Sequence, residues 1–306
     1  MENRGDQEPK RELGNEEIKS EVIRIIEDSF LTTFDEVNEE REVLCTQNDI
    51  IFQKHNIEKI VESIRRSRFV PPKEISEILG IADAHEKIGG FTHTEWTSKK
   101  SVEQYALVED TGTPAKRTYT LLHESIHLLN PPHIVHHGSH PMGGVNAYVL
   151  KLGPVRMAEV FDNGHTEQYY NYKYEEKLFW EAVTDWFAII LLKQSGKFSD
   201  QETEYIEYFK LDKDGDGAGG FAERLLLEYL FKKSPDKQEL IRAFKTALIG
   251  GMDTVAFSDI LQKMTKTNEN IYQELLDVLK NLREDCSNWD ETDDKWCEIV
   301  DKHFGK

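Results

Sequence analysis

From the sequence we expect no disulfide framework, no membrane span and no signal peptide. It has three cysteines, Cys45, Cys286 and Cys297, and no two of them are close enough for a cysteine-rich structural zinc site. This sparse, odd set is typical of a reducing compartment. The longest apolar run, "WFAIILL", is too short to cross a bilayer, and the polar N-terminus has no apolar core. We therefore expect a cytoplasmic protein without a membrane partner.

Basic residues are scarce relative to acidic ones. The 38 Lys and Arg face 57 Asp and Glu, which gives a net charge of -19. Nucleic acids and anionic membranes attract basic surfaces, so we expect neither as a partner. Hydrophobic residues make up 38% of the 306 positions, which is enough for one large domain, or for a catalytic domain with a helical extension.

Apolar spacing predicts an α+β chain that is mostly helical. Helices are expected at 21–44, 57–66, 73–87, 114–129 and 175–194, with two or three more near the C-terminus. We expect a strand at 102–110, a loop at 130–144, a hairpin of strands at 145–152 and 155–162, and an acidic connection at 288–296 that leads into the last helix. We expect the chain to divide into a disordered tail (1–18), an N-terminal helical region (19–88) and a catalytic domain with C-terminal helices (89–306).

The stretch "TLLHESIHLLNPPH" carries the strongest chemical signal. His123 and His127 are four residues apart, so on a helix their imidazoles face the same side and can bind one metal ion. Glu124 lies beside that face, where it can take a proton from a metal-activated water. The neighbouring residues are apolar, which indicates a buried helix.

A catalytic zinc site needs a third protein ligand, and two candidates compete for that position. His133 completes the sequence "HESIHLLNPPH", which resembles the metzincin pattern HExxHxxGxxH except that Asn130 replaces the glycine. Glu181 is the other candidate and lies 54 positions after His127 (181 minus 127) on the apolar helix 175–194.

Two acidic residues on that apolar helix need an explanation. Glu181 and Asp185 are four apart and share a face, and buried carboxylates are costly unless they are paired or bind metal. Their positions are explained if Glu181 binds zinc and Asp185 accepts the free N–H of a zinc-bound histidine.

The combination of His123-Glu124-x-x-His127 with Glu181-x-x-x-Asp185 resembles the gluzincin, or thermolysin-like, zinc metallopeptidases. The resemblance covers residues 90–230 and implies a zincin-like fold for the catalytic domain (89–306), with zinc on both histidines and Glu181, and Asp185 behind His123. It also implies hydrolysis of peptide or protein substrates, in which a zinc-activated water attacks the peptide bond with Glu124 as the general base.

The resemblance further implies two features of the substrate cleft. An edge strand before the active helix would pair with extended peptide, and "SVEQYALVE" at 101–109 is the candidate, with a purely structural strand as the alternative. A downstream Tyr or His would stabilise the oxyanion, and Tyr229, His165 and the histidines of 133–140 are the alternatives.

A second metal pattern occurs in "DKDGDGAGGFAE" at 212–223, which matches an EF-hand calcium loop. The ligands would be Asp212, Asp214, Asp216, the carbonyl of Ala218, and Glu223. Gly219 replaces the usual branched apolar residue at position eight, and the chain has no second loop of this kind. A flexible acidic turn is therefore the alternative to calcium.

Two further functions remain open beside the peptidase. The chain could be a zinc-binding protein without protease activity, although the presence of Glu124 disfavours an inactive scaffold. It could also be a calcium-regulated binding module in which the histidines are incidental, although that reading rests on the 212–223 loop alone.

Overall fold

The computed structural model describes residues 13–44, 50–52, 56–79, 89–98, 101–130, 133–139, 146–152, 156–161, 166–169, 174–203, 221–250, 254–265, 267–282 and 287–305. Helices predominate in these ranges and two sheets accompany them, which confirms the mostly helical α+β class. None of the helices in this part of the chain has the length and apolar content needed to cross a membrane.

The first sheet has three strands in the order β2-β4-β3, which are Arg68–Val70, Ser101–Glu109 and Gly90–Ser98. Strand β3 pairs with β4 antiparallel along nearly its whole length, and short β2 pairs with the end of β4 in parallel. The expected strand 102–110 is confirmed as β4. Its expected place at the sheet edge is wrong, because β4 lies in the middle and β3 forms the edge.

The second sheet has five antiparallel strands in the order β1-β5-β6-β7-β8. Their bounds are Ile50–Phe52, His133–Ser139, Asn146–Leu152, Arg156–Phe161 and Thr166–Tyr169. Strands β6 and β7 confirm the expected hairpin. Strand β5 corrects the expected loop at 130–144, since its backbone pairs with β6 and β1 despite the histidine- and glycine-rich sequence.

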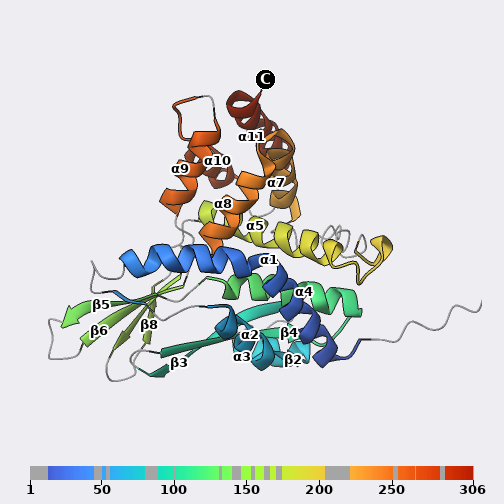
Figure 1. Ribbon diagram of the computed structural model, residues 1–306, viewed down its shortest axis with the longest axis vertical. Coiled ribbons are helices and arrows are strands. Elements are labelled where there is room, and N and C mark those ends of the chain that lie inside the picture. The colour runs from blue at the N-terminus through green and yellow to red at the C-terminus, as the bar shows by residue number, and fades with distance from the viewer. Residues whose placement is uncertain are drawn as a thin grey trace, which may run out of the picture.

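Helix α4 (Pro114–Leu128) connects the first sheet to the helical part of the molecule. It begins where the Thr113 side chain accepts from the backbone N–H of Lys116, with Pro114 in the first turn. One side of α4 packs on β3 and β4, and the other side contacts α5 (Tyr174–Gln194) and α1 (Asn15–Leu44). Figure 1 shows α4 between the sheet and these two helices.

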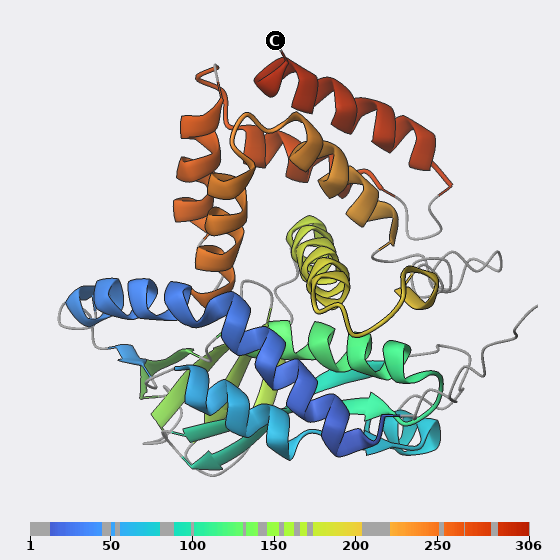
Figure 2. The ribbon, with the colours of Figure 1, turned by 45° about the vertical axis from the view of Figure 1, so that its right-hand side comes forward.

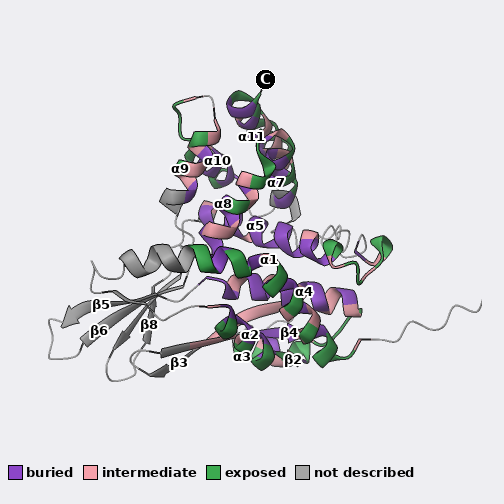
Figure 3. Ribbon diagram, viewed as in Figure 1, coloured by how far each residue is buried: buried purple, intermediate pink, exposed green. Residues whose placement is uncertain are grey.

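Helix α5 lies in the centre of the fold, as its almost uniformly apolar sequence predicts. Figure 2 shows it between α4 and the C-terminal helices, and Figure 3 shows it buried over most of its length. Trp186 stacks on Phe231 of α7 (Phe221–Lys233) with ring centroids 3.9 Å apart, and Phe179 contacts Tyr272 of α10 (Ile271–Lys280). An aromatic core thus holds α5 in place from the side opposite α4.

The N-terminal helices frame the sheet and α4. Helix α2 (Ile57–Arg66) has the predicted bounds, and α3 (Pro72–Leu79) covers the start of the expected helix 73–87, whose remainder lies outside the described residues. Helix α1 begins at Asn15, earlier than expected, because Ile18 packs into the core and is fully buried. The expected end of the tail at residue 18 is therefore wrong, because the helix already includes residues 15–18. Residues 1–12 lie outside the described part.

The C-terminal helices α7, α8 (Lys237–Ile249), α9 (Thr254–Met264), α10 and α11 (Trp289–Phe304) gather on the far side of α5. The acidic segment 288–296, expected to be a connection, is mostly helical because α11 already begins at Trp289. Trp296 in this segment is buried and its indole N–H donates to the carbonyl of Leu226. This packing of Trp296 stabilises a helix in the segment even though its sequence is acidic.

Candidate metal centre

His123 and His127 project from one face of α4, one turn apart. Their Nε2 atoms are 3.2 Å apart, and both side chains are partly exposed. The adjacent turns of α4 bury Leu121, Leu122, Ile126 and Leu128. The apolar residues therefore fix the orientation of the helix, and the histidine face is left to meet α5.

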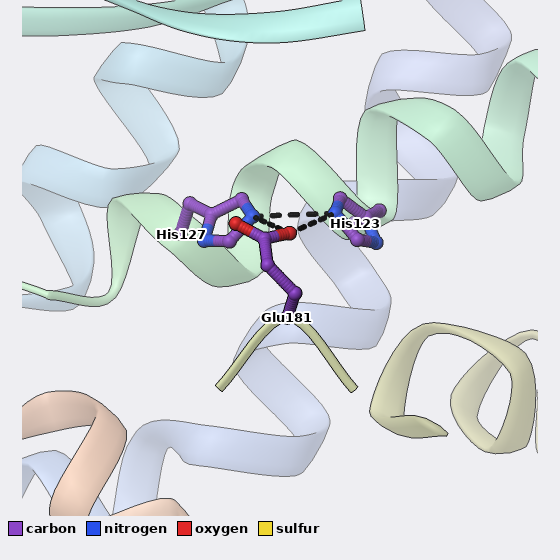
Figure 4. A group of neighbouring side chains, drawn as sticks. All are labelled: His123, His127 and Glu181. Atoms are coloured by element: carbon purple, nitrogen blue, oxygen red, sulfur yellow. Dashed lines mark hydrogen bonds and ion pairs between the residues drawn. The ribbon is translucent and has the colours of Figure 1, made fainter. Parts of the chain in front are cut away.

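Glu181 of α5 points at both imidazoles (Figure 4). Its Oε2 atom lies 3.5 Å from Nε2 of His123 and 3.4 Å from Nε2 of His127. Burial raises the pKa of Glu181, but the charge of His127 and hydrogen bonds from both histidines together outweigh it and hold that pKa well below its usual value. The carboxylate therefore stays ionised and suited to a cation.

The donor set fits a zinc ion. One nitrogen of each histidine and one oxygen of Glu181 lie within 4.8 Å of one another, although the three residues come from two helices. Two imidazoles and a carboxylate are a donor set that Zn²⁺ accepts, and three protein ligands leave a coordination position for a substrate or water. A Glu181 side chain that is 37% exposed keeps this group open to small molecules.

Asp185 lies one turn beyond Glu181 on the same face of α5. It is fully buried, and its Oδ1 lies 3.6 Å from Nδ1 of His123. The predicted arrangement of Asp185 behind His123 is thus present as a juxtaposition of the two groups. A carboxylate at this place favours the imidazole tautomer whose Nε2 is free to bind a metal.

Two residues that the sequence reasoning missed hold Asp185. The Tyr119 hydroxyl donates to Oδ1, and the guanidinium of Arg224 on α7 lies 3.6 Å from Oδ2. Burial, followed by the charge of Asp185, raises the pKa of Tyr119 well above its usual value, so the hydroxyl keeps its proton and donates. Arg224 is buried and supplies the positive charge that a buried carboxylate requires.

The sequence contained a signal for both residues. Tyr119 precedes His123 by four positions, which places it on the histidine face of the predicted helix. Arg224 is a cation within the apolar segment "ERLLLEYLF", the same kind of exception that singled out Glu181.

Glu124 is buried, and β3 holds its side chain. The Thr92 hydroxyl donates to Glu124 Oε2 over 3.0 Å and lies 3.3 Å from its backbone carbonyl. This contact requires β3 to approach α4 closely at Gly90, where an added Cβ would lie 2.8 Å from Cγ2 of Thr120 and 2.9 Å from the carbonyl oxygen of Leu107. Sequence reasoning missed Thr92 because it placed no strand at 90–98.

Another histidine–carboxylate group lies at the C-terminal helices, formed by Glu269, Glu274 and His303. Lys302 forms an ion pair with Glu269 and lies 3.1 Å from Oε2 of Glu274. The buried His303 bonds Thr267 through Nδ1 at 2.7 Å. Because the lysine ammonium already provides the cation for both carboxylates, we interpret this group as an ion-pair network between α10 and α11.

Most of the other predicted site residues fall outside the part of the chain that the structure describes. His133 begins β5, and its side chain and all of His165 lie outside the described residues. The same holds for Asp212, Asp214, Asp216 and Ala218, whereas Glu223 lies on α7 without a described side chain. The Tyr229 hydroxyl donates to Asp301 of α11 over 3.0 Å.

No known family is matched. No protein-family model matches the chain, and no curated protein and no solved structure does either.

Proposed function

We propose that this protein is a zinc-dependent peptidase of gluzincin type, with a zincin-like catalytic region built on the first sheet, α4 and α5. The observation that carries the proposal is the convergence of His123, His127 and Glu181, with the buried Glu124 next to it on α4. Asp185 behind His123 gives further support. A simple ion pair between Glu181 and the histidines would not need a second carboxylate facing Nδ1 of His123, whereas a metal-bound histidine commonly has one.

His123, His127 and Glu181 would hold the zinc ion. When bound, zinc lowers the pKa of a water molecule towards neutrality and polarises the carbonyl of a peptide bond. The two histidines would supply neutral nitrogen donors and Glu181 one negative charge, so Zn²⁺ together with these three ligands would carry a net charge of about +1.

Glu124 acts as the general base in this proposal. Its carboxylate accepts a proton from the attacking water and then donates that proton to the leaving nitrogen as the C–N bond breaks. One oxygen, Oε2, is held by Thr92, which leaves the other oxygen for proton transfer. Because Glu124 is buried, bulk water has little access to the carboxylate that carries the transferred proton.

Strand β3 is the proposed support for an extended peptide. It pairs with β4 on one side, and no other strand of the described residues pairs with its second side. Its Thr92 reaches the base Glu124, so a peptide added to this edge would pass beside the site. Backbone pairing accepts many side chains and suits a peptide or protein substrate.

Metal analysis of purified variants tests the zinc part of the proposal. We expect one zinc per wild-type chain, loss of tight binding in Glu181→Ala, and retention of zinc in His133→Ala. The opposite result, full zinc in Glu181→Ala and none in His133→Ala, would establish the metzincin-like alternative.

Peptide cleavage tests the hydrolytic part. The zinc-loaded wild type should cleave a mixture of unstructured peptides, and Glu124→Gln should keep its zinc and lose more than about a hundred-fold in kcat, since general-base catalysis contributes that much. A zinc-loaded wild type that cleaves nothing would point to a zinc-binding protein without protease activity.

A further inference from the structure

We propose that Tyr119 is a positioning residue of the metal centre, whose hydroxyl fixes Asp185 and, through it, the imidazole of His123. This inference rests on the zinc site of the proposed function, but not on peptide hydrolysis. Neither the HExxH pattern nor the Glu181–Asp185 pair includes a residue at this position.

The geometry places one carboxylate oxygen between a hydroxyl and an imidazole. Tyr119 and His123 lie one turn apart on α4, with ring centroids 6.1 Å apart. The Tyr119 hydroxyl donates to Oδ1 of Asp185, and Nδ1 of His123 lies 3.6 Å from that same oxygen. Any rotation of the carboxylate that breaks the tyrosine bond also displaces the acceptor that faces His123.

The two oxygens of Asp185 have different partners. Arg224 lies 3.6 Å from Oδ2 and compensates the charge, whereas Tyr119 bonds Oδ1 and sets its direction. Asp185 is fully buried and Tyr119 is 5% exposed, so bulk water does not take over either task. A hydroxyl-to-carboxylate bond in such surroundings is short and strong, which makes it a suitable orienting contact.

Most buried tyrosines in proteins find a hydrogen-bond acceptor, and this general tendency is the competing explanation. The acceptor here is a carboxylate of the other ligand-bearing helix, which itself faces a ligand histidine. Tyr272 provides the contrast, because it is equally buried and packs on the same helix α5, yet its ring lies among Phe179 and Phe257. Removal of the two hydroxyls should therefore have different effects on metal binding.

The test measures zinc affinity by competition with a chromophoric chelator in the full-length protein. Tyr119→Phe should weaken zinc binding about ten-fold, the lower end of what loss of an outer-sphere partner of a metal ligand costs, because it acts one bond further out. Tyr272→Phe should bind zinc as the wild type does. The far-ultraviolet spectra of the metal-free variants report whether the fold is retained.

A second readout separates positioning from general loosening of the fold. Cobalt-loaded protein has visible absorption bands that respond to ligand geometry, and they should shift in Tyr119→Phe but not in Tyr272→Phe. Wild-type affinity and an unchanged cobalt spectrum in Tyr119→Phe would overturn this inference and leave the peptidase proposal intact.

The remaining outcomes are equally distinct. A wild-type protein that binds zinc but cleaves no peptide removes the hydrolytic function, while the Tyr119 comparison still decides the inference. A wild-type protein that binds no zinc overturns both proposals at once. Equal weakening of zinc binding in Tyr119→Phe and Tyr272→Phe also contradicts the inference, because the loss would then come from the loosened core.

Discussion

The Thr92 hydroxyl restrains the Glu124 carboxylate through a single hydrogen bond of 3.0 Å. Thr92→Val removes this bond and keeps the branched shape, so the carboxylate becomes free to rotate away from the reacting water. A hydrogen bond to a charged group contributes about 1.5 kcal/mol or more, so we expect kcat to fall roughly ten-fold with little change in KM. Steady-state kinetics with one peptide substrate measures both.

Two variants control that experiment. Thr92→Ser restores the hydroxyl and should recover most of kcat. Thr94→Val makes the same change two residues along the strand, where the threonine oxygen instead accepts from Gln104, and it should leave kcat unchanged. Equal losses of kcat at both threonines would show that the effect comes from the strand and not from Glu124.

Arg224 has a different task from the ligands, because its charge stabilises the fold around Asp185. Arg224→Met leaves a fully buried carboxylate without its nearby cation, which costs about 3 kcal/mol of unfolding free energy. Urea denaturation of the metal-free protein measures this loss. Arg242→Met is the matched control, since Arg242 pairs with Glu239 in an exposed position and its loss should cost less than about 1 kcal/mol. A cost below that of the control would contradict the proposed role.

At the scale of elements, the contact between β3 and α4 depends on the absence of a side chain at Gly90. An alanine Cβ there would lie 2.9 Å from a backbone oxygen of β4, which cannot move aside as a flexible side chain can. We expect Gly90→Ala to cost about 1–3 kcal/mol of unfolding free energy and to lower kcat, because Thr92 moves with the strand. Chemical denaturation and peptide kinetics report the two effects.

The preceding residue offers a control for the Gly90 prediction. At Gly89 an added Cβ would meet Thr120 only at 3.6 Å, an ordinary contact, so Gly89→Ala should change stability by less than about 0.5 kcal/mol. If Gly90→Ala is as stable as Gly89→Ala, β3 has room to shift and the close approach is not required.

Elements with a strong local signal were predictable, and those defined by distant partners were not. Helix α4 is marked by the Thr113–Pro114 start and by its apolar face, and α5 by a nearly continuous apolar sequence. Strand β5 reads locally as a histidine- and glycine-rich loop, and only pairing with β6 makes it a strand. The edge position of β3 likewise depends on which strand lies on each side of β4, and the apolar pattern of one strand does not contain that information.

The site follows the same division. His123, Glu124 and His127 are set by helical spacing, and Glu181 was found because a carboxylate is unexpected on a buried helix. Thr92 comes from a strand 32 positions before Glu124, and its contact depends on how the sheet docks on α4. Such contacts between separate elements have no periodic signature in the sequence.

For the whole molecule, a bound zinc ion should raise thermal stability, because only the folded chain brings α4 and α5 together. At free zinc about one hundred times the Kd, binding adds about 2.7 kcal/mol, which is roughly 4 °C in Tm for a chain of this size. Calorimetry of zinc-loaded and chelator-treated protein measures the difference.

That stabilisation should disappear in Glu181→Ala and weaken as the pH falls, since the imidazoles must release protons before they bind metal. A wild-type Tm that is the same with and without zinc would contradict the proposed site at this scale. If zinc raised the Tm of Glu181→Ala as much as that of the wild type, the ion would have to bind elsewhere in the fold.

The second sheet occupies an unusual place relative to the ligands. Strands β5 to β8 all lie between His127 and Glu181 in sequence. A metal ion bound to His127 and Glu181 would therefore close a loop of the chain that contains most of the second sheet. The helices at the two ends of this loop pack directly on each other. The sheet can therefore lose its pairing without separating the ligands, and amide exchange in β6 and β7 should proceed largely independently of metal release. In folding, the ion would act as a late crosslink, formed once the chain has returned across the 54 positions from α4 to α5 (181 minus 127).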